Sequence, residues 1–289
     1  MKEKAQALRK MLGGKEIIVA PGAIDALSAR LIEQAGFPAV YVSGAGIASS
    51  RLGVPDIGLT TLNEVADSAK HIIQATHVPV ICDIDTGFGN AINAIRTIRE
   101  FEMIGAAGVH IEDQITPKRC GHIERKQLIS QEEMVKKIEA CVYARENDDF
   151  VIIARTDAVA VNGFEDAISR AKAYGKAGAD VLFVEAPRNV DEMKKITELL
   201  CEKPLMINMV VKGGKTPVLP VKELEALGFR IAHYPNLAWT AAIKAMQVVL
   251  KELKEKGYIE DEDKLVSFQE MFEVVGISSF RKLEERFLT

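Results

Sequence analysis

The segment from Lys118 to His122 places one cysteine between two cations and an imidazole. Neighbouring positive charge favours the thiolate and lowers the pKa of a cysteine from its ordinary value of about 8.5. A thiol of this kind can exchange a proton near neutral pH, so we predict a catalytic role for Cys120, with His122 tuning it. No disulfide framework or CxxC spacing links this residue to the other three cysteines, which are Cys82, Cys141 and Cys201.

Three carboxylates precede that segment at positions that suit a hard metal ion. Asp83 and Asp85 are two residues apart, so on an extended segment both side chains point to one side. Glu112 follows the next apolar run. Mg²⁺, with Mn²⁺ as the alternative, prefers such oxygen ligands and keeps several waters. Single acids could instead cap helices or pair with Lys and Arg, but three of them at adjacent strand ends favour the metal site.

The elements that must position these residues alternate regularly along the chain. Short runs rich in Val, Ile, Leu and Ala, each followed by an amphipathic helical pattern, occur at residues 17–20, 39–42, 80–82, 108–111, 151–154, 181–184, 205–208 and 231–234. Nearly continuous apolar runs are typical of parallel strands that are covered on both faces. Eight such units predict an α/β fold, a (β/α)8 TIM-type barrel. A doubly wound open sheet is the alternative, disfavoured because no GxGxxG follows the first run.

Polar residues follow most of the apolar runs, where the carboxyl ends of barrel strands carry the chemistry. Arg155 can bind a carboxylate through two parallel hydrogen bonds, or it can form a structural ion pair with Glu185 or Asp157. Asn208 can donate to a substrate oxygen or cap the following turn. We therefore predict that Arg155, Glu185 and Asn208 bind substrate.

A second substrate-binding segment follows the second apolar run. Ser43, Gly44 and Ala45 offer a hydroxyl and backbone N–H groups that could hold an oxyanion or carboxylate, although a plain Gly-rich turn is the alternative. Tyr41 precedes them and is a candidate base by position only. We also expect two residues to support the site from behind the ligands, namely Asp56 and His110.

Bulk composition excludes several classes of function. The chain has 289 residues, 48% of them hydrophobic, and a formal net charge of -4. This gives no basic footprint for nucleic acid. No apolar run is long enough to span a bilayer, and the charged N-terminus does not resemble a signal peptide, so we expect a cytoplasmic protein with no membrane partner.

The chain is longer than a closed barrel needs. We assign residues 1–256 to the catalytic barrel and residues 257–289 to a C-terminal helical extension. The apolar side chains of this extension need burial, either on the parent barrel or against a neighbouring subunit.

Four motifs together resemble the isocitrate lyase/phosphoenolpyruvate mutase superfamily. They are Asp-Ile-Asp-Thr-Gly-Phe-Gly at 83–89, His-Ile-Glu-Asp-Gln at 110–114, Lys-Arg-Cys-Gly-His at 118–122 and Ala-Arg-Thr-Asp-Ala at 154–158. The resemblance covers essentially the whole chain. It implies an (α/β)8 barrel, a Mg²⁺ site, 2-oxo acid or enolate chemistry and a homotetramer with swapped C-terminal helices. The cysteine in the third motif marks the carbon–carbon lyase branch and disfavours mutase or phosphonate-processing activity.

Two places within this resemblance bear on the substrate. Methylisocitrate lyases tend to carry an arginine for the third carboxylate shortly after the Tyr-Pro of the last strand, where this chain has Thr240. Gly-Gly-Lys-Thr-Pro at 213–217 resembles the dimethylmalate lyases, although Val211-Lys212 replaces the glutamate that relatives usually have. We therefore expect a dicarboxylate substrate, with 2,3-dimethylmalate, cleaved to pyruvate and propionate, as the favoured one. The alternatives are cleavage of 2-methylisocitrate to pyruvate and succinate, and hydrolysis or decarboxylation of oxaloacetate.

Overall fold

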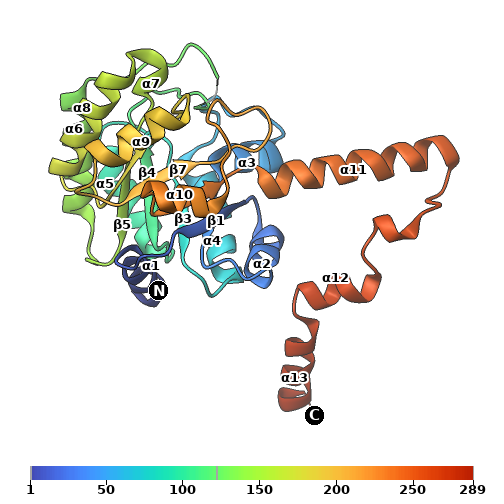
Figure 1. The fold of residues 1–289 in the computed structure, drawn as a ribbon. Coiled ribbons are helices and arrows are strands. Elements are labelled where there is room, and N and C mark those ends of the chain that lie inside the picture. Colours follow the sequence, from blue (N-terminus) through green and yellow to red (C-terminus); the bar gives the residue numbers. More distant parts are fainter. Residues whose placement is uncertain (1, 122, 289) are drawn as a thin grey trace.

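The computed structural model describes residues 2–121 and 123–288, and its centre is a closed parallel barrel (Figure 1). The strands are paired in chain order, and β1 closes the barrel against β8. They are β1 (Ile18–Ala23), β2 (Val40–Val42), β3 (Val80–Asp83), β4 (Gly108–Glu112), β5 (Val151–Thr156), β6 (Val181–Val184), β7 (Leu205–Asn208) and β8 (Ile231–Tyr234). The predicted (β/α)8 barrel is confirmed, and the open-sheet alternative is excluded.

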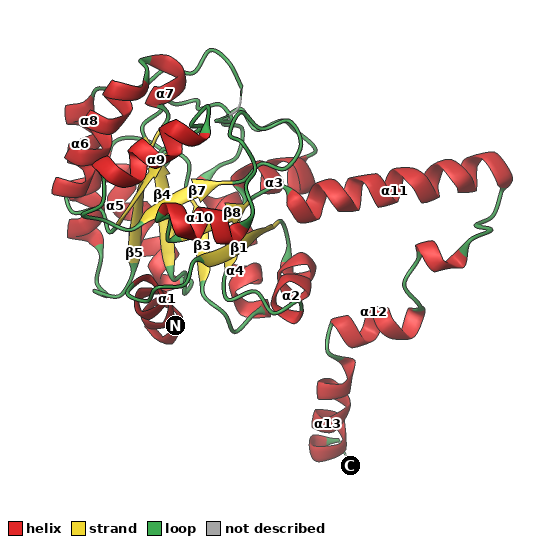
Figure 2. Ribbon diagram, viewed as in Figure 1, coloured by secondary structure: helices red, strands yellow, loops and turns green. Residues whose placement is uncertain are grey.

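Helices form the outer layer around the strands (Figure 2). The main ones are α2 (Ala26–Gln34), α4 (Leu62–Ala75), α5 (Ala91–Met103), α6 (Gln131–Ala144), α8 (Phe164–Lys176), α9 (Val190–Leu199) and α10 (Val221–Leu227). Local sequence explains where several of them begin. Asn90 accepts hydrogen bonds from the backbone of the first turn of α5, and Thr61 and Glu64 form a reciprocal capping box at the start of α4.

The amino-terminal helix closes one end of the barrel. Leu8 and Leu12 of α1 (Lys2–Leu12) are buried against side chains that fill the barrel interior, such as Ile153 and Phe183. Arg9 adds an ion pair to Asp180, at 2.8 Å between Nη1 and Oδ1. The floor of the barrel is therefore sealed, and the opposite end, where the strands finish, remains for chemistry.

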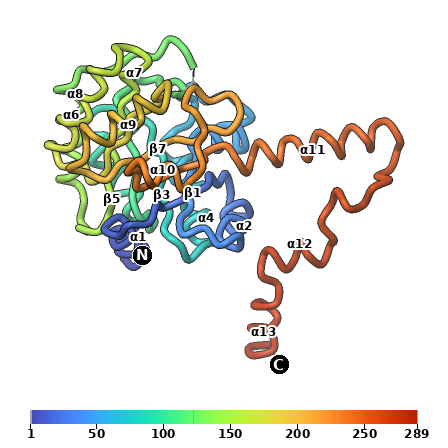
Figure 3. The backbone as a smooth tube through the Cα atoms, in the orientation of Figure 1, coloured from blue at the N-terminus to red at the C-terminus, as the bar shows by residue number. Residues whose placement is uncertain are grey.

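The C-terminal helices form an arm that leaves the barrel. The long helix α11 (Leu237–Lys256) projects outward, and the chain then returns through η2 (Glu262–Lys264) to α12 (Phe268–Val274) and α13 (Ile277–Phe287), as Figures 1 and 3 show. Apolar side chains of this arm are exposed, Phe268 by 76% and Phe280 by 58%. The division of the chain at residue 256 stays a prediction, and α11 projects from the barrel although it precedes that boundary.

None of the described helices is both long enough and apolar enough to cross a membrane.

Candidate active site

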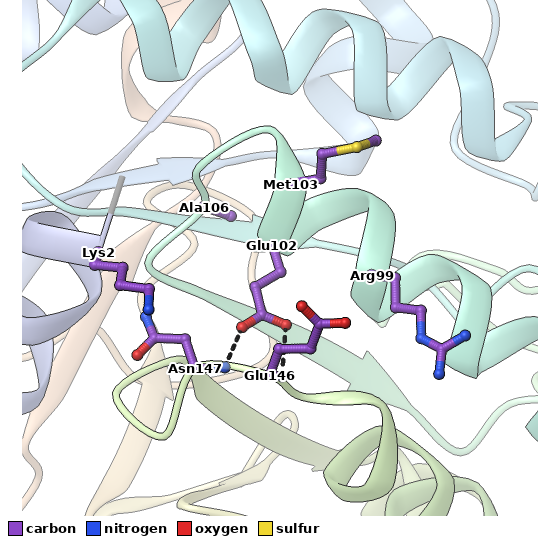
Figure 4. Close-up of a pocket in the computed structure, with 7 residues that line it drawn as sticks. All are labelled: Lys2, Arg99, Glu102, Met103, Ala106, Glu146 and Asn147. Carbon is purple, nitrogen blue, oxygen red and sulfur yellow. Dashed lines mark hydrogen bonds between the residues drawn. The ribbon is translucent and has the colours of Figure 1, made fainter.

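Two cavities lie at opposite ends of the barrel. The one in Figure 4 lies beside the floor, where Glu102 accepts hydrogen bonds from the backbone N–H groups of Glu146 and Asn147 and so fastens a loop. The other has a volume of about 330 Å³ and opens at the carboxyl ends of the strands. Its lining includes most of the residues predicted from sequence, among them Tyr41, Ser43, Ala45, Asp56, Asp83, Cys120, Arg155 and Asn208. We therefore take this second cavity as the candidate active site.

Strand register brings the rim residues together in pairs. Asp83 of β3 stands opposite His110 of β4, and Glu112 of β4 stands opposite Arg155 of β5. The hydroxyl of Tyr41 lies 2.9 Å from Nδ1 of His110. Burial is the main cause that raises the pKa of Tyr41 well above its ordinary value and lowers that of His110 well below its own. Both shifts favour the uncharged forms of these two side chains at neutral pH.

A buried lysine holds two of the carboxylates on one side of the cavity. Nζ of Lys118 lies 2.6 Å from Oδ1 of Asp56 and 2.8 Å from Oδ1 of Asp85. Burial raises the pKa of Asp85 to about 6; Lys118 acts to lower it, and Asp83 to raise it. Asp56 lines the cavity and pairs with Lys118, which the sequence interpretation had treated only as a neighbour of the cysteine, and its supporting role stays a prediction.

The turn that carries Asp85 is held by two outer helices. Asp85 itself has a φ of 48°, in the left-handed region that few side chains adopt. The hydroxyl of Thr97 in α5 donates to the carbonyl of Gly87, at 3.1 Å, and Nζ of Lys137 in α6 donates to the carbonyl of Thr86, at 3.0 Å. These contacts fix an otherwise unfavourable backbone, and with it the direction of the Asp85 carboxylate.

Arg155 lies in the other half of the site, among three carboxylates. Its Nε and Nη2 donate to the two oxygens of Asp157, at 2.9 and 3.0 Å, and Nη1 lies 3.3 Å from Glu112. Glu185 is 3.7 Å from Nε and accepts from the amide of Asn208, at 3.2 Å. The predicted ion pairs with both Asp157 and Glu185 are present, and Arg155 also lines the cavity, where it can reach a ligand.

Residues of the cysteine loop form part of the cavity lining. The backbone N–H of Cys120 donates to the carbonyl of Asp56, at 3.1 Å, and the side chain of Gln114 bonds the backbone of Arg119 in both directions. Gly121 packs directly on Arg155 and Glu185, because a Cβ at this residue would collide with the guanidinium. His122, which we predicted to tune the thiol, lies outside the described residues.

The Ser43 segment begins the four-residue helix α3 (Gly44–Ile47). Ser43 caps it by accepting a hydrogen bond from the N–H of Gly46, at 3.1 Å, so both predicted roles of this segment, turn and cradle, remain compatible with its geometry. A Cβ on Gly44 would lie 3.0 Å from Asp83 and 3.3 Å from Asp85. The glycine therefore lets the backbone approach the carboxylates closely.

Two of the predicted metal ligands have cationic partners, Asp85 in Lys118 and Glu112 in Arg155. Among residues 2–121 and 123–288, no three His, Cys, Asp or Glu side chains are arranged as a metal site. Even so, Glu112 Oε1 is buried with no hydrogen-bond partner among the described residues, and burial raises the pKa of Glu112 well above its usual range. Hard oxygen donors that are buried at this cost suit a divalent cation. Asp83, Asp85 and Glu112 carry the oxygen donors that a divalent cation prefers, and both the ligand set and the identity of the metal stay predictions.

Comparison with known proteins identifies the family of this chain. The family profile described as phosphoenolpyruvate phosphomutase matches residues 8–254. A 2,3-dimethylmalate lyase from Eubacterium barkeri is 45% identical over 286 residues, which are 99% of this chain and 98% of that protein. The chain belongs to the PEP mutase/isocitrate lyase superfamily. The resemblance stated from the four motifs is confirmed.

Other relatives extend this assignment. A 2-methylisocitrate lyase from Aeropyrum pernix is 45% identical over 95% of this chain and 88% of its own length. A solved 2,3-dimethylmalate lyase, a superfamily member by its description, aligns with a TM-score of 0.93 at 37% identity over 98% of this chain and 95% of that one. A phosphonopyruvate hydrolase solved with oxalate and Mg²⁺ aligns at 0.89 with 33% identity, over 99% of each chain. The chain is an enzyme, a lyase of this superfamily.

The superfamily motifs did not reveal every residue that forms the cavity. Trp239, Val210 and Ile123 contribute an apolar wall that the sequence interpretation did not include. Trp239 lies in the first turn of α11, where its ring N–H donates to the carbonyl of Pro235, at 3.2 Å. Next to it, the exposed Thr240 donates to the carbonyl of Asn236, at 2.6 Å. The sequence feature that could have indicated Trp239 as a cavity residue is that it is the one tryptophan of the chain and follows Tyr234-Pro235 at the end of the last strand.

We predict that the stability of Lys137→Met relative to the native chain is higher at pH 7 than at pH 10. The variant loses the hydrogen bond to Thr86 at every pH, but it is spared the cost of burying an ammonium group only where the native lysine is charged in the unfolded chain. Burial lowers the pKa of Lys137, so the unfolded chain binds more protons between that pKa and the ordinary lysine value, and native stability rises with pH there. Urea unfolding at pH 7, 8.5 and 10 measures the difference.

The control for that measurement is Lys136→Met, because Lys136 is the neighbouring residue and its side chain is 73% exposed. Its stability relative to the native chain should not change with pH. A relative stability of Lys137→Met that is constant or rises with pH would contradict the assigned burial cost.

Proposed function

We propose that the protein cleaves the C2–C3 bond of a 2-hydroxy-2-methyl dicarboxylate, with 2,3-dimethylmalate as the substrate and pyruvate and propionate as the products. The observation that carries this proposal is one cavity that combines Cys120, Arg155 and the Asp83 carboxylate with an apolar wall of Trp239 and Val210. The charged side chains of this cavity suit the carboxylates of the substrate, and the apolar side chains of Trp239 and Val210 suit its methyl groups.

Binding of the substrate uses two parts of the rim. Ser43, Gly44 and Ala45 hold the end that becomes pyruvate. Asp83, Asp85 and Glu112 hold Mg²⁺, or Mn²⁺ as the alternative, which when bound supplies positive charge to the 2-hydroxyl and its neighbouring carboxylate. Support comes from the approach of Gly44 to Asp83 and Asp85 and from the unpartnered oxygen of Glu112 among the described residues.

The second carboxylate is held by Arg155 and Asn208. Negative charge grows on this carboxylate as the C2–C3 bond breaks, because the bonding electron pair moves to C3 and delocalises into the carboxyl group. A fixed guanidinium and amide stabilise that charge more than they stabilise the ground state. Asp157 and Glu185 keep both donors in place.

Two protons complete the reaction. The 2-hydroxyl loses one as the carbonyl of pyruvate forms, and C3 gains one from Cys120 as propionate forms. Tyr41 is the candidate for the group that takes the first proton, with His110 at 2.9 Å from its hydroxyl as the next acceptor. Burial raises the pKa of the Tyr41 phenol, so this side chain would need added positive charge nearby to act as a base. Apolar side chains at the cavity mouth, including Ile123, exclude water from the carbanion.

Cleavage of 2-methylisocitrate is the second candidate function. The relative with that name is as identical to this chain, at 45%, as the dimethylmalate lyase is. The loop after β7 could supply a cation for a third carboxylate, because Lys212 is exposed close in sequence to Val210 of the cavity wall. Thr240 cannot take that role, since its hydroxyl is committed to the helix backbone.

We further propose that the protein is a homotetramer in which C-terminal arms are exchanged between subunits. The exposed apolar side chains of α12 and α13, which include Phe268, Phe280 and Leu283, support this because such surface is costly in water. The small-molecule substrate, the absence of nucleic-acid and membrane partners, and a cytoplasmic location stay predictions from sequence.

We expect pyruvate release in the presence of Mg²⁺ to be faster from 2,3-dimethylmalate than from 2-methylisocitrate, because the cavity offers an apolar wall and no arginine at residue 240. A coupled dehydrogenase assay measures both rates side by side, with an EDTA-treated sample as the metal control. Oxaloacetate, assayed in parallel by its disappearance, tests the hydrolase alternative. A higher kcat/KM for 2-methylisocitrate or oxaloacetate would overturn the proposed substrate.

Cys120→Ser should lower kcat by about two to four orders of magnitude, the usual contribution of a positioned acid, while pyruvate binding measured by calorimetry persists. Cys201→Ser is the matched control, because Cys201 is exposed and lies outside the cavity lining, and it should retain full activity. Turnover by Cys120→Ser at the native rate would contradict the role of the thiol as the acid.

Light scattering should give a mass four times the 31.7 kDa of one chain. Phe280→Asp should reduce that mass, because it places a charge in the apolar face of α13, whereas Lys282→Asp on the same helix should leave the mass unchanged. A native chain that runs as a monomer at micromolar concentration would rule out the tetramer.

A further inference from the structure

Two buried lysines flank the cysteine in the chain, and they attach its loop to opposite sides of the cavity. Lys118 lies two residues before Cys120 and binds Asp56 and Asp85. Lys126 lies six residues after it, and its side chain, which is only 2% exposed, reaches Asp157 in the Arg155 half of the site. Neither motif nor spacing assigned a role to Lys126.

Lys126 makes two contacts that connect the loop to the barrel. Its Nζ donates to Oδ1 of Asp157, at 2.7 Å, and to the carbonyl of Gly121, at 2.5 Å. The same Asp157 carboxylate accepts both hydrogen bonds from Arg155. One carboxylate therefore fixes both the guanidinium and the residue next to Cys120.

The carboxylate is itself rigidly placed. The backbone N–H of Asp157 donates to Oδ1 of Asp113, at 3.0 Å, and Thr156 and Tyr174 each donate to Oδ2 of Asp113, at 2.7 Å. Burial alone would raise the pKa of Asp157, but Arg155 and Lys126 outweigh it and lower the pKa below its ordinary value. Asp157 is thus an ionised anchor on the barrel wall.

Packing adds a second constraint at the same place. A Cβ added to Gly121 would collide with the Arg155 guanidinium and would lie 2.9 Å from Cγ of Glu185. The loop backbone therefore packs against Arg155 and Glu185. Lys126 holds it there through two hydrogen bonds, and the missing side chain of Gly121 permits the close contact.

We propose that Lys126 is a positioning residue of this lyase, which holds Cys120 at a fixed place over Arg155 by joining the Gly121 carbonyl to the Asp157 carboxylate. The proposal rests on the proposed function, in which Cys120 and Arg155 act on adjacent atoms of one substrate. Loss of this link displaces the thiol from C3 and leaves the binding groups on the barrel unchanged, so it lowers kcat more than it raises KM.

The test is Lys126→Met, which keeps the length and apolar stem of the side chain and leaves Asp157 paired with Arg155. Alkylation of the substrate-free enzyme by iodoacetamide, followed by peptide mass spectrometry, gives the rate at each cysteine. We expect the rate at Cys120 to rise about tenfold or more, as loss of a charged hydrogen bond permits, while exposed Cys201 reacts at its native rate. Kinetics should show about a tenfold loss of kcat with KM changed less than threefold, and Lys126→Arg should restore part of both.

Arg125→Met is the matched control, since Arg125 is the adjacent cation and is exposed. It should change neither the alkylation rate nor kcat. If Lys126→Met also makes the buried Cys82 and Cys141 reactive, the fold has opened. In that case Gly121→Ala, whose Cβ would push the loop away from Arg155, tests the proposal through the alkylation rate at Cys120.

Unchanged alkylation at Cys120 in a folded Lys126→Met would overturn the proposal, and so would an equal loss in Arg125→Met. Alkylation requires no substrate, so failure of the enzyme to cleave 2,3-dimethylmalate leaves this readout intact. The role of Lys126 and the proposed reaction can therefore fail separately.

Discussion

The burial of Arg155 among carboxylates is the interaction on which the upper end of this barrel depends. A buried guanidinium is tolerated only where partners compensate for its lost hydration. Here the partners are Glu112 at the end of β4 and Asp157 and Glu185, which directly follow β5 and β6. Two of these partners also accept from a further donor, Glu185 from the amide of Asn208 and Asp157 from Lys126. Charge pairing in a dry site thus specifies side-chain positions across half of the rim.

The same constraint operates on the other side of the cavity, where a single buried cation again faces more than one carboxylate. There one cation, Lys118, compensates Asp56 and Asp85. Its partners come from a loop after β2 and from the strained turn after β3, so this lysine connects segments that share no backbone pairing. The loop with Cys120 lies between the two clusters and is attached to each by one lysine. Binding of substrate charge in either cluster therefore acts on groups that also hold the loop.

The sequence predicted the barrel and much of its rim because both depend on short-range pattern. Short apolar runs locate the strands, and a polar residue at the end of several of them lines the cavity, as for Asp83, Arg155 and Asn208. Lys126 escaped prediction because its partner Asp157 is 31 residues away, and a lone lysine in a polar loop is ordinarily solvated. Trp239 was not predicted because the direction of its side chain depends on the angle at which α11 leaves the barrel. The periodicity of the helix sequence does not determine that angle.

The closure of one end of the barrel by α1 has a consequence for the evolution of such a chain. Leu8 and Leu12 seal the barrel at the end remote from every charged residue of the rim, so much of the apolar burial that supports folding is independent of the reacting groups. Lineages can therefore exchange rim residues and acquire new reactions with little penalty in foldability. Proteins named as lyases, hydrolases and mutases share this backbone at TM-scores of 0.89 to 0.94, which is the divergence that such a separation of scaffold from chemistry permits.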